Sequence, residues 1–191
     1  MSMVSSTFGL RPIECAQIKT VKVKDDLIGM KIKNAKHTDG RSFGKYRTIR
    51  FQIVDEKSEE FEALGASYRL TALFSNKSKV EAERWLKGAR NFLNQLYAKN
   101  RDLKKLARKN RITLYSGRHQ FSANAKQAGV PAIEIAAMMG HGSDETHVKS
   151  YGKRRVGSGR FTIQADPLDV ERVEERMQVK QDNQFSQQLG R

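Results

Sequence analysis

The sequence predicts an α+β domain that is mostly helical and carries one small antiparallel β-sheet. Alternating apolar and polar residues in "MKIKN" and "RTIRFQI" flank a turn-rich segment, which is typical of a β-hairpin. From Val80 onward, apolar residues instead recur at helical spacing, and short loops with glycine or proline separate the later segments. A length of 191 residues favours one compact domain.

The first element is expected to be a short helix within residues 9–23. Ile13, Ala16 and Ile18 lie at roughly helical spacing there, and Pro12 suits a first helical turn. The hairpin follows, with "HTDGRSFG" as its turn. One face of the hairpin is expected to be basic, with the residues Lys31, Lys33, Lys36, Arg41, Lys45, Arg47 and Arg50.

The middle of the chain predicts helices of unequal clarity. Residues 55–78 are weakly patterned and predict a short helix followed by a loop. Val80–Tyr97 is a clear helix, because Trp85, Phe92 and Leu96 share one face. After it, "KNRDLKKLARKNR" has seven basic residues against one acidic residue. Such a run is either a solvated helix face or a phosphate-binding surface, and both interpretations remain open.

Three helical segments then follow in quick succession. Ser116 is expected to cap the first, which ends at Gly129, and Pro131 begins the second, which ends at Gly140. The third is expected to begin after Ser143 as its cap, because the acidic residues that follow suit the positive end of a helix.

The C-terminal part differs in charge from the rest. Residues 161–191 hold six acidic and four basic residues, so the positive excess belongs to residues 1–160. We therefore expect a domain of residues 1–160 and a C-terminal extension of residues 161–191, with one helix from about Pro167 to Val179 and a frayed polar end.

Composition restricts the class of function. The chain has 36 Lys and Arg against 21 Asp and Glu, a net charge of +15, which favours a polyanionic partner: nucleic acid first, an anionic membrane surface second. The single cysteine, Cys15, excludes an internal disulfide and a multi-cysteine zinc site. No apolar run approaches the roughly 20 residues that span a bilayer, and we expect a cytoplasmic protein.

Four short segments point to one family. They are "FGLRPIE" with Arg11, "YSGRHQF" with Arg118, "MGH" with His141 and "VKSYGK" with Tyr151. In this order they resemble the "TGLRxxE", "HxxRH", "LGH" and tyrosine motifs of the tyrosine recombinases, the phage-integrase family, over about residues 8–153 of the chain. Each residue alone is ordinary, as a surface ion-pair partner, a helix-end histidine or a core aromatic; their joint occurrence carries the resemblance.

The resemblance implies a DNA breaking-rejoining fold and a catalytic set. Tyr151 would be the nucleophile that forms a 3′-phosphotyrosyl bond, and Arg11 and Arg118 would hold the phosphate oxygens, for which the guanidinium fork is well suited. His141 would add a hydrogen bond or handle a proton. Lys36, in "NAKHTDGR", matches the hairpin lysine that protonates the leaving 5′ oxygen.

The resemblance also implies the partners. They are double-stranded DNA of the bacterial nucleoid and a homo-tetramer formed on that DNA, while the isolated domain would be a monomer; no metal or other cofactor is implied. Family members usually place a DNA-binding domain before the catalytic one, so we expect the chain to be a catalytic fragment. The helix after Tyr151 packs either on a neighbouring protomer or within its own chain.

Further residues receive supporting roles. Glu14, one turn after Arg11, is placed to orient that arginine, and His119 is expected to be a buried, hydrogen-bonded support. Tyr115 departs from the family, because it stands where a histidine is usual; we expect it to position phosphate or Arg118 and not to react. The expected DNA-binding residues are Lys31, Lys33, Arg41, Arg47, Lys104, Lys105 and Arg108.

Two other functions remain open at this point. A topoisomerase of the type IB kind uses the same constellation and relaxes supercoils without exchanging partners. A DNA-binding protein of the same fold that has lost turnover is the other alternative, for which Tyr115 is the sequence hint. Integration of a phage or mobile element, excision and plasmid resolution share the recombinase chemistry.

Overall fold

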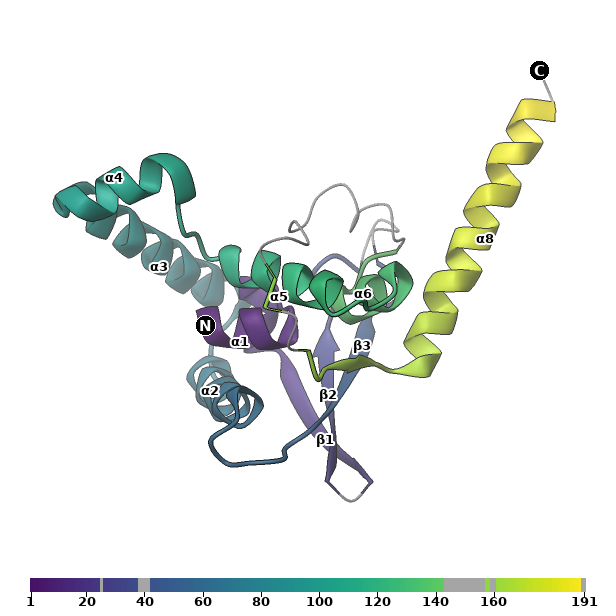
Figure 1. Ribbon diagram of the computed structural model, residues 1–191, viewed down its shortest axis with the longest axis horizontal. Coiled ribbons are helices and arrows are strands. Elements are labelled where there is room, and N and C mark those ends of the chain that lie inside the picture. Colours follow the sequence, from purple (N-terminus) through teal and green to yellow (C-terminus); the bar gives the residue numbers. More distant parts are fainter. Residues whose placement is uncertain (25, 38–41, 143–156, 159–160, 190–191) are drawn as a thin grey trace.

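The computed structural model describes residues 1–24, 26–37, 42–142, 157–158 and 161–189. Within these ranges the protein is α+β, as predicted, with helices around one small antiparallel sheet (Figure 1). The elements are α1 Ser2–Phe8, the 3-10 helix η1 Pro12–Ala16, β1 Ile18–Lys24, β2 Leu27–Lys33, β3 Tyr46–Gln52, α2 Glu59–Phe74, α3 Lys79–Lys99, α4 Arg101–Asn110, α5 Ser116–Gln127, α6 Ala132–Met139, β4 Gln164–Ala165 and α8 Pro167–Leu189.

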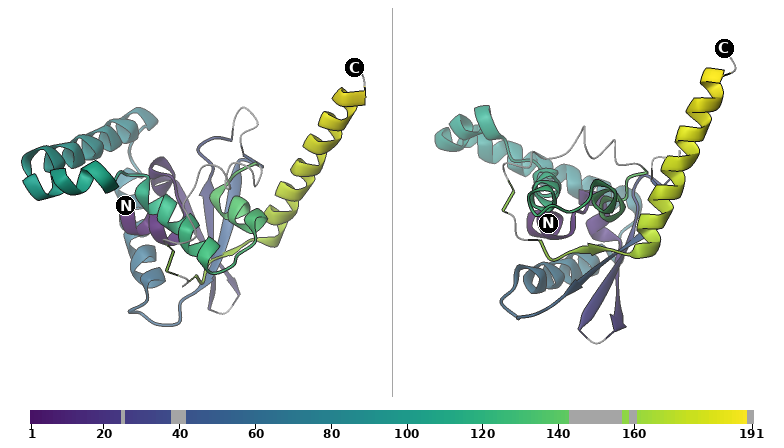
Figure 2. Two further views of the ribbon diagram at one scale, coloured as in Figure 1. Left: turned by 45° about the horizontal axis from the view of Figure 1, so that its top comes forward. Right: turned by 45° about the vertical axis from the view of Figure 1, so that its right-hand side comes forward.

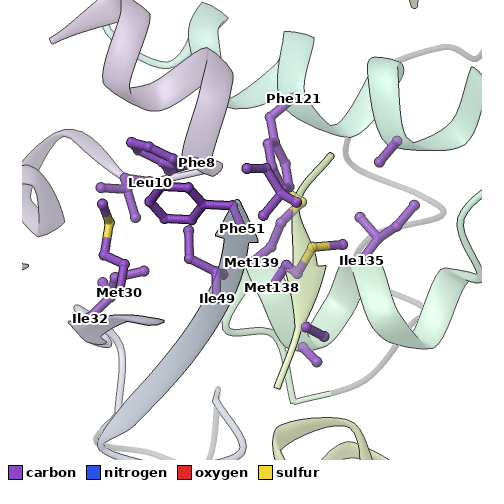
Figure 3. Close-up of a cluster of buried hydrophobic side chains, with 14 of the residues drawn as sticks. Phe8, Leu10, Met30, Ile32, Ile49, Phe51, Phe121, Ile135, Met138 and Met139 are labelled. Carbon is purple, nitrogen blue, oxygen red and sulfur yellow. The ribbon is translucent and has the colours of Figure 1, made fainter. Parts of the chain in front are cut away.

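The sheet contains the predicted hairpin. Its order is β1-β2-β3-β4, and β2 pairs antiparallel with β3 so that Lys33 faces Tyr46 and Met30 faces Ile49. Alternation along β3 buries every second side chain, and Phe51 lies on the same face as Ile49. This face of the sheet packs against the helices (Figure 3).

The N-terminal prediction was partly wrong. The helix within residues 9–23 is confined to η1, and Ile18–Lys24 forms β1 beside β2. In "IKTVKV" the β-branched residues favour an extended backbone, and pairing with β2 decides the outcome. The helix α1 was not predicted at all, although Val4 and Phe8, one turn apart, are both buried.

The helices α2 and α3 also differ from expectation. Residues 55–78 hold a helix of 16 residues, α2, which begins after the cap Ser58. The predicted helix α3 is present, but the face expected to be buried is largely exposed, with Phe92 60% exposed. Figure 1 shows the reason: α3 packs with α4 as a pair that projects from the body, so its outer turns have few neighbours.

Two of the three later helices are confirmed. α6 ends at Gly140, which has a left-handed φ of 65°, and the turn after α5 contains Gly129 with φ 81°. Ser116 is not the cap of α5; its hydroxyl accepts from the Thr113 N–H at 2.8 Å, and Tyr115 occupies the cap position. The third helix, predicted after Ser143, lies outside the described residues.

The C-terminal segment joins the same core as the rest of the chain. Strand β4 pairs with β3 through Ala165 and Ile49, and Ile163 and Val173 belong to the core cluster. Helix α8 is longer than predicted, and its first turns pack on α6 of the same chain. Its remainder extends away from the body (Figure 2). Among the described residues, no helix is long and apolar enough to cross a bilayer.

Candidate active site

Four of the predicted site residues come together in the interior. Arg11 directly precedes η1, Glu14 lies within it, Arg118 lies in the first turn of α5, and His141 follows the end of α6. All four are buried, with Arg11 the most exposed at 5%. Residues that are far apart in the sequence therefore share one site.

Glu14 is the centre of this site. Its carboxylate accepts from Arg11 Nη1 at 2.6 Å and from Arg47 Nη2 at 2.8 Å, and it forms an ion pair with Arg118 at 3.8 Å. Burial by itself raises the pKa of Glu14, but the charges of Arg47, Arg11 and Arg118 outweigh burial and hold that pKa well below its ordinary value. Three positive charges thus surround one negative charge, and the excess suits a bound anion.

Arg118 and His141 are in direct contact. Arg118 Nη2 lies 2.9 Å from His141 Nε2, and it also donates to the carbonyl of Met139 at 2.5 Å. Because a guanidinium only donates, this contact is a hydrogen bond in the tautomer of His141 that carries its proton on Nδ1 and accepts at Nε2. Arg118 Nη1 donates to the carbonyl of Gly9. In this conformation both Nη groups of Arg118 donate to main-chain carbonyls.

Arg47 is the main correction to the predicted site. It was expected on the basic DNA-binding face of the hairpin, but its side chain is 0% exposed. Strand alternation is the reason, because Arg47 shares the core face with Ile49 and Phe51. The sequence "RTIRFQI" already indicates this orientation, because Arg47 stands two and four positions before Ile49 and Phe51 and so lies on their face of the strand.

Lys36 lies in the connection between β2 and β3 and is exposed. The preceding residue, Ala35, donates its N–H to Glu14 Oε1 at 3.1 Å. The backbone that carries Lys36 therefore contacts the carboxylate at the centre of the site.

Tyr115 and His119 flank Arg118 on the outside. Tyr115 is 41% exposed at the N-terminus of α5. His119 was expected to be buried, but it is exposed, because it lies with Gln120 on the side of α5 that faces solvent. Partial burial, and then the charge of Arg118, lower the pKa of His119.

A residue that the sequence did not suggest, Arg176, also reaches this region. Its Nη1 donates to the carbonyl of Ser42 at 2.6 Å, and its Nε lies 2.9 Å from where a Cβ on Gly142 would be. Gly142 follows His141 directly, so α8 contacts the chain beside the site. Helical spacing alone does not distinguish Arg176 from the other charged residues of α8.

The predicted DNA-binding residues occupy different surfaces. Lys104 and Lys105 are exposed on α4, Lys31 is exposed on β2 with its ammonium 5.0 Å from the centre of the Tyr46 ring, and Lys33 is half-buried. Arg41 and Tyr151 lie outside the described residues, as does the side chain of Arg108 in α4. Helices α4 and α8 project at opposite ends of the body, with α5 and α6 between them (Figure 1).

No group of three or more His, Cys, Asp or Glu side chains in the described part of the chain could hold a metal ion. No protein-family model, no curated protein and no solved structure matches the chain.

Proposed function

We propose that the protein is a site-specific DNA recombinase of the tyrosine type, which cleaves and rejoins DNA strands through a 3′-phosphotyrosyl intermediate. One observation carries the proposal. Three separate segments of the sequence form one buried cluster, in which Glu14 forms ion pairs with Arg11 and Arg118, and Arg118 lies against His141. Two arginines beside a histidine are the donors that a phosphodiester needs when charge develops on its oxygens. The net charge of +15 supports DNA as the substrate.

The reaction requires one bond to form as another breaks. Tyr151 Oη would attack phosphorus, the P–O5′ bond would break, and the energy of the diester would be kept in the new tyrosyl ester. The phenol proton would leave to a base, for which neutral His141 is suited once Arg118 turns to the phosphate. The 5′ oxygen would take a proton from Lys36, and a 5′ hydroxyl of the partner strand would reverse the step.

Binding of DNA would have to open the site. Arg118 is 0% exposed and donates to two main-chain carbonyls. An anionic phosphate oxygen is a stronger acceptor than a neutral carbonyl, because charge-assisted hydrogen bonds are roughly twice as strong. The exchange of acceptors is therefore favourable once the phosphate is in place.

Covalent capture tests the proposal. A pool of labelled duplexes, with random sequence around a nick, is incubated with the 191-residue chain, and protein-DNA adducts that resist SDS are isolated and sequenced. The nick lets the short released strand diffuse away, so that the adduct cannot reverse. We expect wild type to enrich a defined sequence. Tyr151→Phe should give no adduct, and Tyr115→Phe, a matched change at the exposed tyrosine beside Arg118, should still give one.

Two results would reject the recombinase assignment. The first is binding of the pool by wild type without any covalent product, and the second is an adduct formed by Tyr151→Phe. Relaxation of supercoiled plasmid that carries the selected site, without any strand exchange between two such sites, would identify a type IB topoisomerase instead.

A DNA-binding protein of the same fold without turnover is the second candidate. The observation that favours it is the complete burial of Arg118, whose donors are engaged by the carbonyls of Gly9 and Met139. Sequence-selective binding by wild type in a gel-shift assay, together with no adduct under any condition, would support this function.

A further inference from the structure

The guanidinium of Arg47 links three separate parts of the chain. Its Nε donates to the carbonyl of Met138 at the end of α6 at 2.7 Å, and its Nη2 donates to Glu14 Oε2 at 2.8 Å. Its Nη1 donates to the side-chain oxygen of Asn34, just beyond β2. Each nitrogen thus holds a different segment, and the arginine fixes their relative positions.

Two of these contacts restrain the segment that carries Lys36. Asn34, two residues before it, is 0% exposed, and its amide nitrogen also donates across the loop to the carbonyl of Gly44 at 2.8 Å. Ala35 donates its N–H to Glu14. Both residues immediately before Lys36 are therefore tied to the Arg47–Glu14 ion pair.

Packing does not explain an arginine at this position. Residue 47 pairs with Ile32 and shares the core face of the sheet with Ile49 and Phe51, where an apolar side chain would pack well. Replacing a buried ion pair by apolar residues of similar volume is often neutral or stabilising. The guanidinium instead fixes the relative positions of several acceptors at once, because its donors lie in one rigid plane.

We propose that Arg47 is a positioning residue for Lys36. Arg47 holds the hairpin segment so that the Lys36 ammonium group reaches the leaving 5′ oxygen of the DNA. The proposal rests on the proposed recombinase function. In the step it serves, the P–O5′ bond breaks and the oxygen takes a proton from the Lys36 ammonium. Arg47 itself does not contact DNA, because it is buried and its donors are occupied by protein.

A substrate with sulfur in place of the 5′ bridging oxygen isolates this role. A thiol is far more acidic than an alcohol, so a thiolate leaves without prior protonation. A defect that acts through the proton from Lys36 disappears with the sulfur substrate. A general disturbance of the arginine cluster slows both substrates alike.

The experiment compares single-turnover cleavage of the two substrates, built on the duplex selected by covalent capture. The variants are Arg47→Met, Lys36→Ala and Asn34→Ala, with Arg50→Met as the matched control. Arg50 lies on the same strand with its side chain on the other face, and it pairs with Asp166 at 2.7 Å. We expect Arg47→Met and Lys36→Ala to lose about 100-fold or more with oxygen, the size of a general-acid contribution. With sulfur the loss should be under about fivefold, because no proton is needed, and Arg50→Met should match wild type on both substrates.

The outcomes separate this inference from the proposed function. If wild type forms no adduct with the oxygen substrate, the recombinase assignment fails, and the inference fails with it. If wild type cleaves but Arg47→Met is equally slow on both substrates, or Lys36→Ala is not rescued by sulfur, the positioning role is wrong and the recombinase assignment stands. If Arg47→Met does not fold, Asn34→Ala tests the proposal instead, because this variant keeps the Arg47–Glu14 pair. A loss of cleavage rate in Asn34→Ala that the sulfur substrate does not restore would overturn the proposal.

Discussion

Replacement of Glu14 by glutamine tests the electrostatic design of the site. The carboxylate accepts hydrogen bonds from Arg11 Nη1, from Arg47 Nη2, and from the main-chain N–H groups of Arg11 and Ala35. An amide of the same shape keeps one oxygen but turns an NH₂ group toward donors, and it leaves three buried guanidinium groups without their counter-ion. Breaking a buried ion pair by removing one partner costs about 3–5 kcal/mol. We expect Glu14→Gln to lose that much free energy of unfolding, a large share of the roughly 5–15 kcal/mol typical of a domain.

Urea denaturation followed by circular dichroism measures this loss at pH 7, with Glu174→Gln, an exposed acid on α8, as the control. The pH dependence gives a second readout. The pKa of Glu14 is lower in the folded chain than its ordinary value of 4.5, so its contribution is present above that value and is lost as the pH falls below it. Wild type should lose stability from about pH 5 downward more steeply than Glu14→Gln. A variant within about 1 kcal/mol of wild type, with the same pH slope, would refute the counter-ion role of Glu14.

Three further outcomes are expected. Gly140→Ala should destabilise the protein far more than Gly129→Ala. Both glycines have positive φ, but only at Gly140 would the new Cβ overlap the Asn34 side chain. Thermal unfolding compares the two variants, and equal losses of stability would contradict the close packing at Gly140. The Cys15 thiol should react with a thiol reagent only as fast as the chain opens, because burial raises its pKa to about 11; rapid labelling of the native chain in a thiol-reagent assay would contradict its burial. Arg176→Ala should increase amide hydrogen exchange around Ser42, whose carbonyl it holds, and unchanged exchange there would mean that α8 does not restrain this loop.

The sequence predicts best where the structure is local. The ends of α6 follow from Pro131 and from Gly140, and the hairpin follows from alternation on either side of a turn. The positions of Arg11, Arg118 and His141 relative to one another do not follow from spacing at all. They were expected to meet only because their motifs resemble a family. The fold brings Arg11 and Arg118 to the same carboxylate, Glu14, and places Arg118 against His141.

The errors share a physical cause, which is that tertiary neighbours decide what a pattern means. Phe92 satisfies the helical period of α3, but it stays exposed because that part of the helix projects from the body. Arg47 belongs to a basic stretch by composition, but strand parity turns it inward, and Glu14 and Asn34 supply acceptors from other segments. Charge alone suggested a DNA contact, whereas burial with three acceptors indicates a structural link.

The three arginines around Glu14 are therefore unequal as ligands for a phosphate. Arg47 is committed, since three of its nitrogens donate to protein acceptors and one of these is the carboxylate itself. Arg118 holds main-chain carbonyls through its Nη atoms and pairs with Glu14 only at 3.8 Å, so its bonds are the weaker ones to replace. Arg11 donates to Glu14 through Nη1 at 2.6 Å, but it is the most exposed of the three arginines. In the proposed function, a phosphate would compete for Arg118 and reach Arg11 from the side open to solvent, and it would leave Arg47 in place. In the proposed recombinase, Arg47 would keep Glu14 and the hairpin anchored, while Arg11 and Arg118 would turn toward the phosphate of the DNA.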